Sequence, residues 1–118
     1  MEISAKEMAK SAYEALADKK ARDVKILDIS EISPIADYFL VASGENPAKR
    51  SAMTDAVEEA LGRLGCSGMR KEGDHRSTWI LLDYKEIIVH IFSDEDREFY
   101  DLERVWRDAK ILSPEELT

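Results

Sequence analysis

Apolar positions recur at two spacings along the chain, and each spacing predicts a type of secondary structure. Residues 5–20 follow Ser4, a helix-capping residue, and carry apolar side chains three and four positions apart, which predicts a helix. Its apolar stripe is narrow and rich in alanine, so we expect it to pack on a flat surface such as a sheet. A second helix is expected from Pro47 to about residue 64, because Asn46 can cap it and Gly65 can end it.

Shorter apolar runs predict five strands. Residues 23–30 alternate between apolar and polar positions, and residues 37–43 are almost continuously apolar. Residues 66–73 are a weak candidate flanked by glycine, and residues 78–92 hold two strands joined by a short loop. The first two strands therefore precede the second helix and the other three follow it.

A third helix is expected over residues 93–106, with acidic residues in its first turn and one apolar side formed by Phe99, Leu102, Val105 and Trp106. The predicted order is α-β-β-α-β-β-β-α. This order favours an α+β fold in which helices pack on a mixed five-stranded sheet. We expect a single domain over residues 1–109 and a loose tail over residues 110–118.

The two strands of residues 78–92 can be divided by face if Lys85 and Glu86 form a two-residue loop, so that opposed residue numbers sum to 171. One face is then apolar except for a phenol and should face the core: Ile80, Leu82, Tyr84, Ile87, Val89 and Ile91. The other face mixes large apolar with ionisable groups: Trp79, Leu81, Asp83, Ile88, His90 and Phe92. A buried carboxylate is costly, so we expect this mixed face to be partly solvated.

A face that joins aromatic and charged residues is typical of protein-binding surfaces. The competing interpretation, with about equal weight from these residues alone, is that the mixed face lies under another helix or forms a homodimer interface, with Trp79 and Phe92 pairing across a two-fold axis. A mass measurement would distinguish a homodimer from a monomer.

Composition narrows the classes of function. The chain has 118 residues, of which 44% are hydrophobic and 36% charged, typical of one folded domain. Its 17 basic and 25 acidic residues give a net charge of -8, which disfavours direct recognition of nucleic acid and favours a basic protein partner. A single cysteine, Cys66, and the lack of a signal-like or membrane-spanning run favour a reducing, cytoplasmic location without a membrane partner.

The residues that enzymes use are sparse. One cysteine and two histidines, His75 and His90, do not make a zinc site, and the spacing of Cys66 supports no catalytic dyad. The turn Gly44 to Asn46 follows a strand and begins a helix, an arrangement that can hold an anion, but no D-x-D pair of carboxylates follows it. We therefore expect no catalytic residue, no metal and no cofactor. The alternative is a residual nucleotide-binding or nucleotidyltransferase-type enzyme at Gly44 to Asn46.

Three stretches together resemble the ribosomal silencing factor family, also called the Iojap-related family. They are A-D-Y-F-L-V-A-S-G at residues 36–44, W-I-L-L-D-Y-K-E-I-I-V-H-I-F at residues 79–92, and R-E-F-Y-D-L-E-R-V-W at residues 97–106. The resemblance spans roughly residues 5–109, and the ordered combination is specific. It implies a nucleotidyltransferase-like fold without the catalytic residues, and so a binding protein rather than an enzyme.

The resemblance also implies a partner. Members of the family bind the fourteenth protein of the large ribosomal subunit on the face that meets the small subunit. They thereby block subunit association and repress translation when nutrients are short. By motif position, Trp79 matches the partner-contacting tryptophan of the family, and we extend the expected partner-binding surface to neighbouring residues: Leu81, Asp83, His90, Phe92, Arg97 and Tyr100.

Two positions depart from the family pattern. Lys85 stands where the family usually has a glycine after L-D-Y, so a turn that needs a positive φ would be strained and the register could shift. Glu45 and Asn46 replace the common threonine and serine after Gly44, which keeps helix capping and weakens an anion site.

Overall fold

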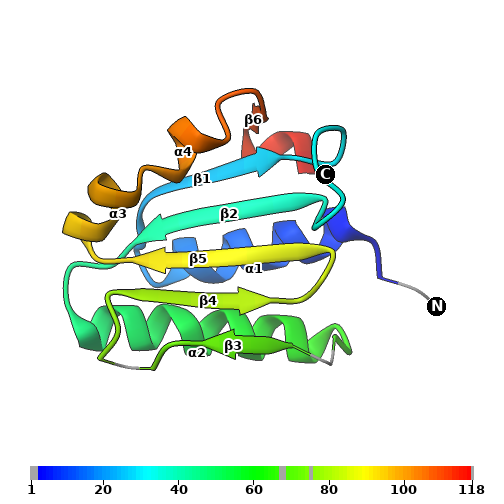
Figure 1. Cartoon of the computed structure of the whole chain (residues 1–118). Helices are drawn as coiled ribbons and strands as arrows, with labels where there is room; N and C mark the ends of the chain where they lie inside the picture. The colour runs from blue at the N-terminus through cyan, green and yellow to red at the C-terminus, as the bar shows by residue number, and fades with distance from the viewer. Residues whose placement is uncertain (1–2, 67–68, 75, 118) are drawn as a thin grey trace.

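The core of the fold is a mixed sheet in the order β3-β4-β5-β2-β1-β6 (Figure 1). The computed structural model describes residues 3–66, 69–74 and 76–117. Within them the sheet has six strands, one more than expected: β1 (Arg22–Asp28), β2 (Tyr38–Ser43), β3 (Arg70–Glu72), β4 (Trp79–Asp83), β5 (Ile87–Phe92) and β6 (Lys110–Leu112). The central strands β2 and β5 pair in parallel and the other pairs are antiparallel, so the predicted α+β class with a mixed sheet is confirmed.

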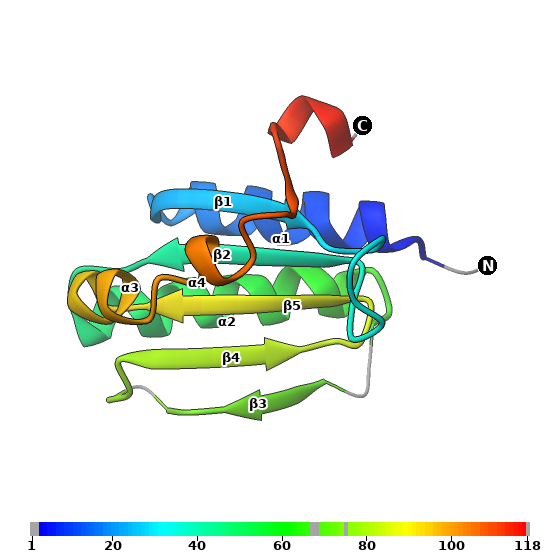
Figure 2. The ribbon, with the colours of Figure 1, turned by 45° about the horizontal axis from the view of Figure 1, so that its top comes forward.

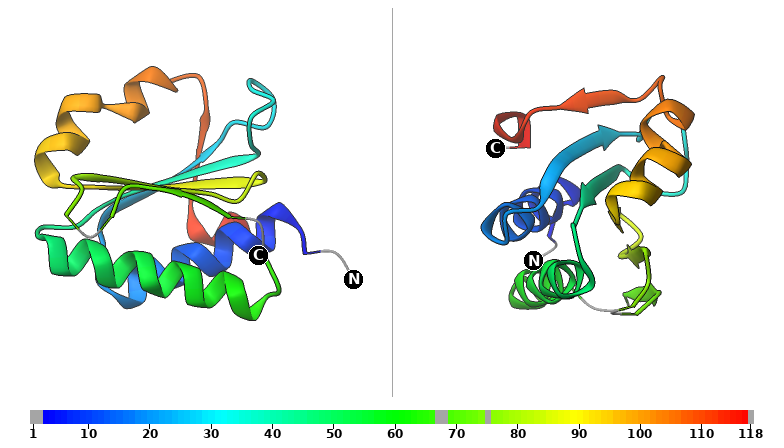
Figure 3. Two further views of the ribbon diagram at one scale, coloured as in Figure 1. Left: turned by 60° about the horizontal axis from the view of Figure 1, so that its bottom comes forward. Right: turned by 90° about the vertical axis from the view of Figure 1, so that its left-hand side faces the viewer.

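Two long helices, α1 (Ala5–Asp18) and α2 (Pro47–Arg63), lie side by side on one face of the sheet (Figure 3). The expected caps start them, because the Ser4 side chain accepts a hydrogen bond from the Glu7 N–H and the Asn46 side chain accepts one from the Lys49 N–H. The main core lies between this helix layer and the sheet, and it includes all six residues of the predicted core face of β4 and β5.

The hairpin of β4 and β5 has the predicted register, with Trp79 opposite Phe92 and Asp83 opposite Ile88. Lys85 has a φ of 74°, so this lysine adopts the left-handed conformation for which the family uses glycine. The Asp83 Oδ1 atom accepts a hydrogen bond from the Lys85 N–H at 2.8 Å, which ties the turn to the strand before it. The conformation is therefore kept without a shift in register.

The third predicted helix is two helices, α3 (Asp94–Tyr100) and α4 (Leu102–Val105), which lie on the opposite face of the sheet from α1 and α2 (Figures 2 and 3). The break falls at Asp101, whose φ of 45° turns the chain out of the helical path. As a result the expected single apolar side does not form: Leu102 and Trp106 are half-buried, while 77% of Phe99 and 68% of Val105 are exposed.

Residues 110–117, expected to be loose, are instead part of the fold. β6 pairs with β1, and the short helix η1 (Pro114–Leu117) brings Leu117 into the main core, where it is buried. Strand pairing at the edge of the sheet and the burial of one leucine hold this segment in place. Its apolar pattern is too short to predict either contact from the sequence. A weak strand was expected in residues 66–73, and Arg70–Glu72 form β3 there. Residues 67 and 68 of this stretch lie outside the described residues. The expected likeness to nucleotidyltransferases stays a prediction.

Gly44→Ala is expected to destabilise the fold by about 1–3 kcal/mol, because a Cβ atom at Gly44 would lie 2.7 Å from Arg50 Cγ and 2.9 Å from Met53 Sδ in the core. Gly62→Ala in α2 is the matched control, since no atom lies within 4 Å of its added Cβ. The control should be neutral or stabilising by up to about 1 kcal/mol. Urea unfolding of the two variants checks the difference; equal stabilities would show that the close packing at Gly44 does not constrain the turn.

Candidate partner-binding face

The face of the sheet opposite α1 and α2 is covered only in part. Figure 2 shows α3 and α4 beside β1, β2 and β5, while β3 and β4 carry no helix on this side within the described residues. A second apolar cluster lies here, buried at Leu27, Ile29, Ala36, Phe39, Val41, Ile88 and Phe92, with partly buried residues around it: Trp79, Leu81, Leu102, Trp106 and Ala109. We call this surface the open face.

Aromatic rings form the centre of the open face. The ring of Trp79, on β4, has its centroid 4.6 Å from that of Tyr100 on α3 and 5.0 Å from that of Phe92 on β5. Tyr100 is 41% exposed, and it also makes an edge contact with the exposed ring of Phe99. Away from Trp79, the ring of Trp106 covers Phe39 of β2, with 5.2 Å between the ring centroids. Trp79 and Tyr100, both partly exposed, thus form the aromatic part of the uncovered rim.

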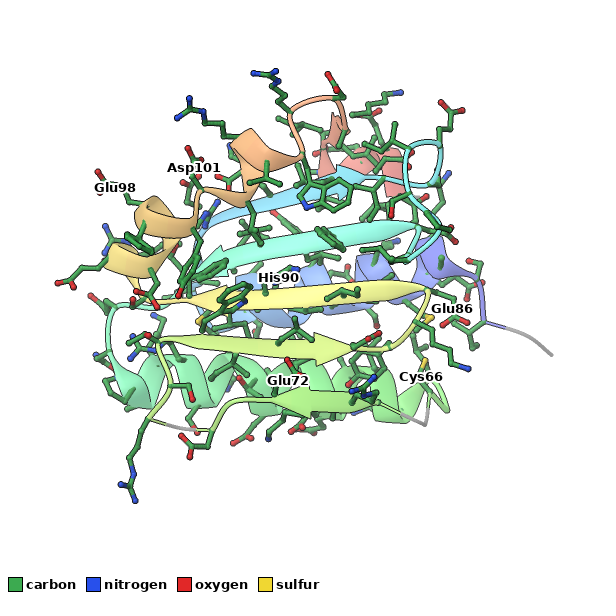
Figure 4. The ribbon with its side chains drawn as sticks, viewed as in Figure 1. Cys66, Glu72, Glu86, His90, Glu98 and Asp101 are labelled. Atoms are coloured by element: carbon green, nitrogen blue, oxygen red, sulfur yellow. The ribbon has the colours of Figure 1, made fainter. Side chains whose placement is uncertain are left out.

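His90 lies in the middle of this cluster and is only 4% exposed (Figure 4). The Trp79 Nε1–H donates a hydrogen bond to His90 Nδ1 at 3.1 Å. An indole nitrogen can only donate, so His90 must be neutral with its proton on Nε2. Burial lowers the pKa of His90 to about 4. Among the described residues its Nε2 has no hydrogen-bond partner. The ring of Phe39 packs edge-to-face against the imidazole, with 4.8 Å between the ring centroids.

Arg97 fixes α3 and α4 against the sheet. It is 8% exposed, and its guanidinium donates to Ser43 Oγ on β2 at 2.9 Å, to the Asp23 carbonyl on β1 at 2.7 Å and to Glu103 on α4 at 3.1 Å. This one side chain therefore joins β1, β2, α3 and α4. Its donors are directed into the protein, so Arg97 presents no free cation to a partner.

The structure brings four of the predicted site residues into one cluster: Trp79, His90, Phe92 and Tyr100. Leu81 and Asp83 follow Trp79 along β4 on the same face and are half-buried. His90, Phe92 and Arg97 are buried, so they lie beneath the surface rather than on it. Sequence spacing missed Phe99 and Val105 as exposed residues, because it treated residues 93–106 as one helix and nothing in the spacing marks the break at Asp101.

Acidic residues border the open face. Figure 4 places Glu98 and Asp101 at the end of the face formed by α3, and Glu72 on the edge strand β3. A hollow of about 460 Å³ beside Arg97 has five carboxylates in its lining (Asp23, Asp94, Glu98, Asp101 and Glu103) against two arginines. This excess of negative charge disfavours phosphate there and favours contact with a basic surface.

In the turn from Gly44 to Asn46, backbone groups are bonded to other parts of the protein. The Gly44 N–H donates to the Phe92 carbonyl at 2.8 Å, and the Gly44 carbonyl accepts from Arg50 Nη1 at 2.9 Å. Asn46 caps α2. The donors that a phosphate would need from this turn are therefore partly used, and Arg50, buried, fills the space beside Gly44. Within the described residues there is no group of three His, Cys, Asp or Glu side chains that could hold a metal ion.

None of the helices formed by the described residues has the length and apolar character needed to cross a membrane. The longest of them, α2, places charged side chains along its outer side.

Comparisons with known proteins agree with the resemblance in sequence. Residues 2–118 match the family model described as "Ribosomal silencing factor during starvation". A "Ribosomal silencing factor RsfS" of Bacillus subtilis is 32% identical over 109 residues, which cover 92% of each chain. A crystal structure of a protein from Chromobacterium violaceum superposes with a TM-score of 0.81 at 33% identity, covering 90% of this chain and 87% of that one. A mouse protein named "Mitochondrial assembly of ribosomal large subunit protein 1" is 27% identical over 77% of this chain and 41% of its own length.

Acidification is expected to destabilise the fold through His90. Unfolding returns this histidine from a pKa of about 4 to its ordinary value of 6.5, so the unfolded state binds more protons between these values. Its contribution is present above pH 6.5 and is lost as the pH falls toward 4, by up to about 3 kcal/mol. Urea unfolding from pH 7 to 4, compared with His90→Leu, isolates the effect, because the carboxylates and His75 are present in both proteins. Parallel stability curves for the two proteins would contradict it.

Arg97→Met is expected to lower the free energy of unfolding by about 3 kcal/mol, because it leaves Ser43 Oγ and the Asp23 carbonyl without their donor. Arg22→Met is the matched control. Arg22 pairs with Asp94 at 3.0 Å, but both side chains are at least half exposed, so its loss should cost less than about 1 kcal/mol. Chemical denaturation measures both values. Similar losses for the two variants would show that Arg97 does not hold α3 and α4 in place.

Proposed function

The chain belongs to the ribosomal silencing factor family, and on that basis we propose that it represses translation by binding the large ribosomal subunit. The partner within the subunit is its fourteenth ribosomal protein, and the open face is the surface that binds. Bound there, the domain occupies space that the small subunit needs, so the two subunits do not associate. The protein represses translation in the cytoplasm, where the subunits associate, and the repression is greatest when nutrients are limiting.

The observation that carries the proposal is the partly covered aromatic cluster on the open face. Trp79 and Tyr100 are packed side by side, 4.6 Å apart, yet Tyr100 remains 41% exposed and Trp79 half-buried. Rigid aromatic side chains with a solvated edge are the residues that dominate binding energy at protein interfaces. Their burial by a partner removes apolar surface from water without first ordering flexible side chains.

Charge supports a basic partner. The net charge of -8 gives a field that attracts cationic surfaces, and the acids of α3 lie at the edge of the open face. Such a field raises the rate of encounter and favours one orientation, while the aromatic cluster supplies most of the affinity. A ribosomal protein with basic groups around an apolar patch fits both features.

The site residues divide by exposure. We assign direct contact with the partner to Trp79, Leu81, Asp83 and Tyr100, which the structure leaves half-buried or exposed on the open face. Phe92 supports the ring of Trp79 from below. Arg97 holds α3, and with it Tyr100, against the sheet. The exposed Phe99 extends the aromatic surface beyond Tyr100.

This mechanism requires no turnover. A folded domain with principal extents of 36 × 32 × 25 Å, bound on the face that meets the small subunit, would exclude that subunit by its volume alone. A second copy of the chain could also bury the open face, and a homodimer would then compete with the ribosome for the same residues.

Trp79→Ala is expected to weaken binding to isolated large subunits by about 2 kcal/mol, or roughly 30-fold, because it removes the central aromatic contact. The same variant should lose the ability to inhibit association of large and small subunits. Co-sedimentation with purified large subunits measures the first effect, and light scattering of mixed subunits measures the second.

Tyr13→Ala is the matched control, since Tyr13 is a half-buried aromatic residue on α1, in the helix layer on the other side of the sheet. It should bind and inhibit as the wild type does, provided that its fold is intact by circular dichroism. No co-sedimentation of the wild-type protein would overturn the proposed function. Unchanged binding of a folded Trp79→Ala variant would remove the open face from it.

A further inference from the structure

We propose that His90 is a positioning residue that locks the indole of Trp79 in the orientation the partner meets, so that the partner is offered the carbon edge and face of the ring and not its N–H group. The inference rests on the proposed function, because it describes how the open face recognises its partner. It concerns a residue that is itself buried and contacts no partner.

The lock is a single directed hydrogen bond. Trp79 Nε1 on β4 donates to His90 Nδ1 on β5 at 3.1 Å. The two residues are diagonal neighbours in the hairpin, since Trp79 lies opposite Phe92 and His90 lies opposite Leu81. Without that bond an indole on a sheet has two orientations about its outer torsion, one with nitrogen inward and one with nitrogen outward. The acceptor lies on a side chain that is 4% exposed, so only the inward orientation brings Nε1 to it, whereas the outward orientation would turn the N–H toward solvent and leave Nδ1 unpaired.

His90 is suited to accept and unsuited to donate toward Trp79. The rings around it (Phe39, Trp79 and Phe92) bring no charge, and burial keeps the imidazole neutral near pH 7. A neutral imidazole has one acceptor nitrogen, and the Trp79 bond fixes that nitrogen as Nδ1. Within the described residues Nε2 has no hydrogen-bond partner. If position 90 served packing alone, an aliphatic side chain would stabilise the fold more than histidine does, because an unpaired buried polar atom costs free energy.

Neighbouring rings complete the lock. Phe92 lies 5.0 Å and Tyr100 4.6 Å from the Trp79 ring, centroid to centroid, and both are tilted rather than parallel to it. These contacts limit sideways movement but do not distinguish the two orientations of the indole, since both present similar surfaces to a ring. The His90 bond supplies that distinction.

The consequence is a prediction about the partner. With its only donor used internally, Trp79 can offer a partner dispersion contact and the negative face of its π system. The complementary group is an aliphatic side chain, or the stem and cation of a lysine or arginine, and not a hydrogen-bond acceptor such as a carboxylate. The acids that border the open face favour the basic choice.

The lock is tested first in the isolated protein. The chain has two tryptophans, so a protein labelled with ¹⁵N in tryptophan gives two indole N–H signals, and Trp106→Phe assigns them. We expect slow hydrogen exchange at Trp79 Nε1 in the wild type and exchange at least tenfold faster in His90→Leu. His90→Asn, whose side-chain oxygen can replace Nδ1 as acceptor, should retain part of the protection. A Trp79 signal that exchanges as fast in the wild type as in His90→Leu would overturn the lock.

The effect on recognition is tested by a double-mutant comparison with large subunits. His90→Leu should weaken co-sedimentation about fivefold, as expected for the loss of one net hydrogen bond, and His90→Asn should weaken it less. In a Trp79→Phe background, which has no indole N–H, His90→Leu should cause no further loss. Thermal unfolding of each variant verifies the fold. The same fivefold loss in both backgrounds would show that His90 acts without Trp79, and would overturn the proposal.

The two proposals fail in different ways. If the wild-type protein does not bind large subunits, the proposed function and the role of His90 in recognition both fail, while the indole exchange still decides whether His90 holds the ring. If binding is strong and His90→Leu binds as tightly as the wild type, only the positioning role fails.

Discussion

The parallel pairing of β2 with β5 at the centre of the sheet is the constraint on which the other features depend. Parallel strands are stable when both faces of the sheet are covered, and five of the six residues of β2 and all six of β5 are buried. The helices α1 and α2 cover one face of both strands. Among the described residues, the helices on the other face are the short α3 and α4, and residues between β1 and β2 (Ile29 and Ala36) and aromatic side chains complete its partial cover. An apolar surface with a solvated edge is therefore a consequence of the fold itself.

Two buried polar side chains make that partial cover rigid. Arg97 holds the helix pair through contacts with both β1 and β2, and His90 holds the one aromatic side chain that β4 contributes. Each carries a desolvation cost that an aliphatic residue would avoid. What they provide is direction, because a guanidinium and an imidazole fix the orientation of their partners and an aliphatic contact does not. Both were expected from the sequence to touch the partner, and both lie under the surface instead.

Sequence patterns were sufficient wherever one local rule acts alone. The caps at Ser4 and Asn46, the division of β4 and β5 into two faces, and the register around Lys85 follow from nearest neighbours in the chain, and each is confirmed. The errors arise where a tertiary contact competes with the local pattern. Asp101 interrupts a good helical pattern between α3 and α4, which both lie on the sheet face, and Leu117 is held by the core although its own segment is short. The burial of Arg97 depends on contacts 54 and 74 residues away, which no local pattern can show.

The turn after β2, where the sequence left a nucleotide-binding site open, binds other parts of the protein. A phosphate site at a helix N-terminus needs free backbone N–H groups and space for close approach. Here the Gly44 N–H bonds to β5, and the space beside Gly44 is filled by Arg50. Arg50 in turn donates to the carbonyls of Gly44 and of Ser77, two residues before Trp79. The turn is thus used to anchor the start of the strand that carries the aromatic contact, and the Gly44 N–H is not free to bind a phosphate.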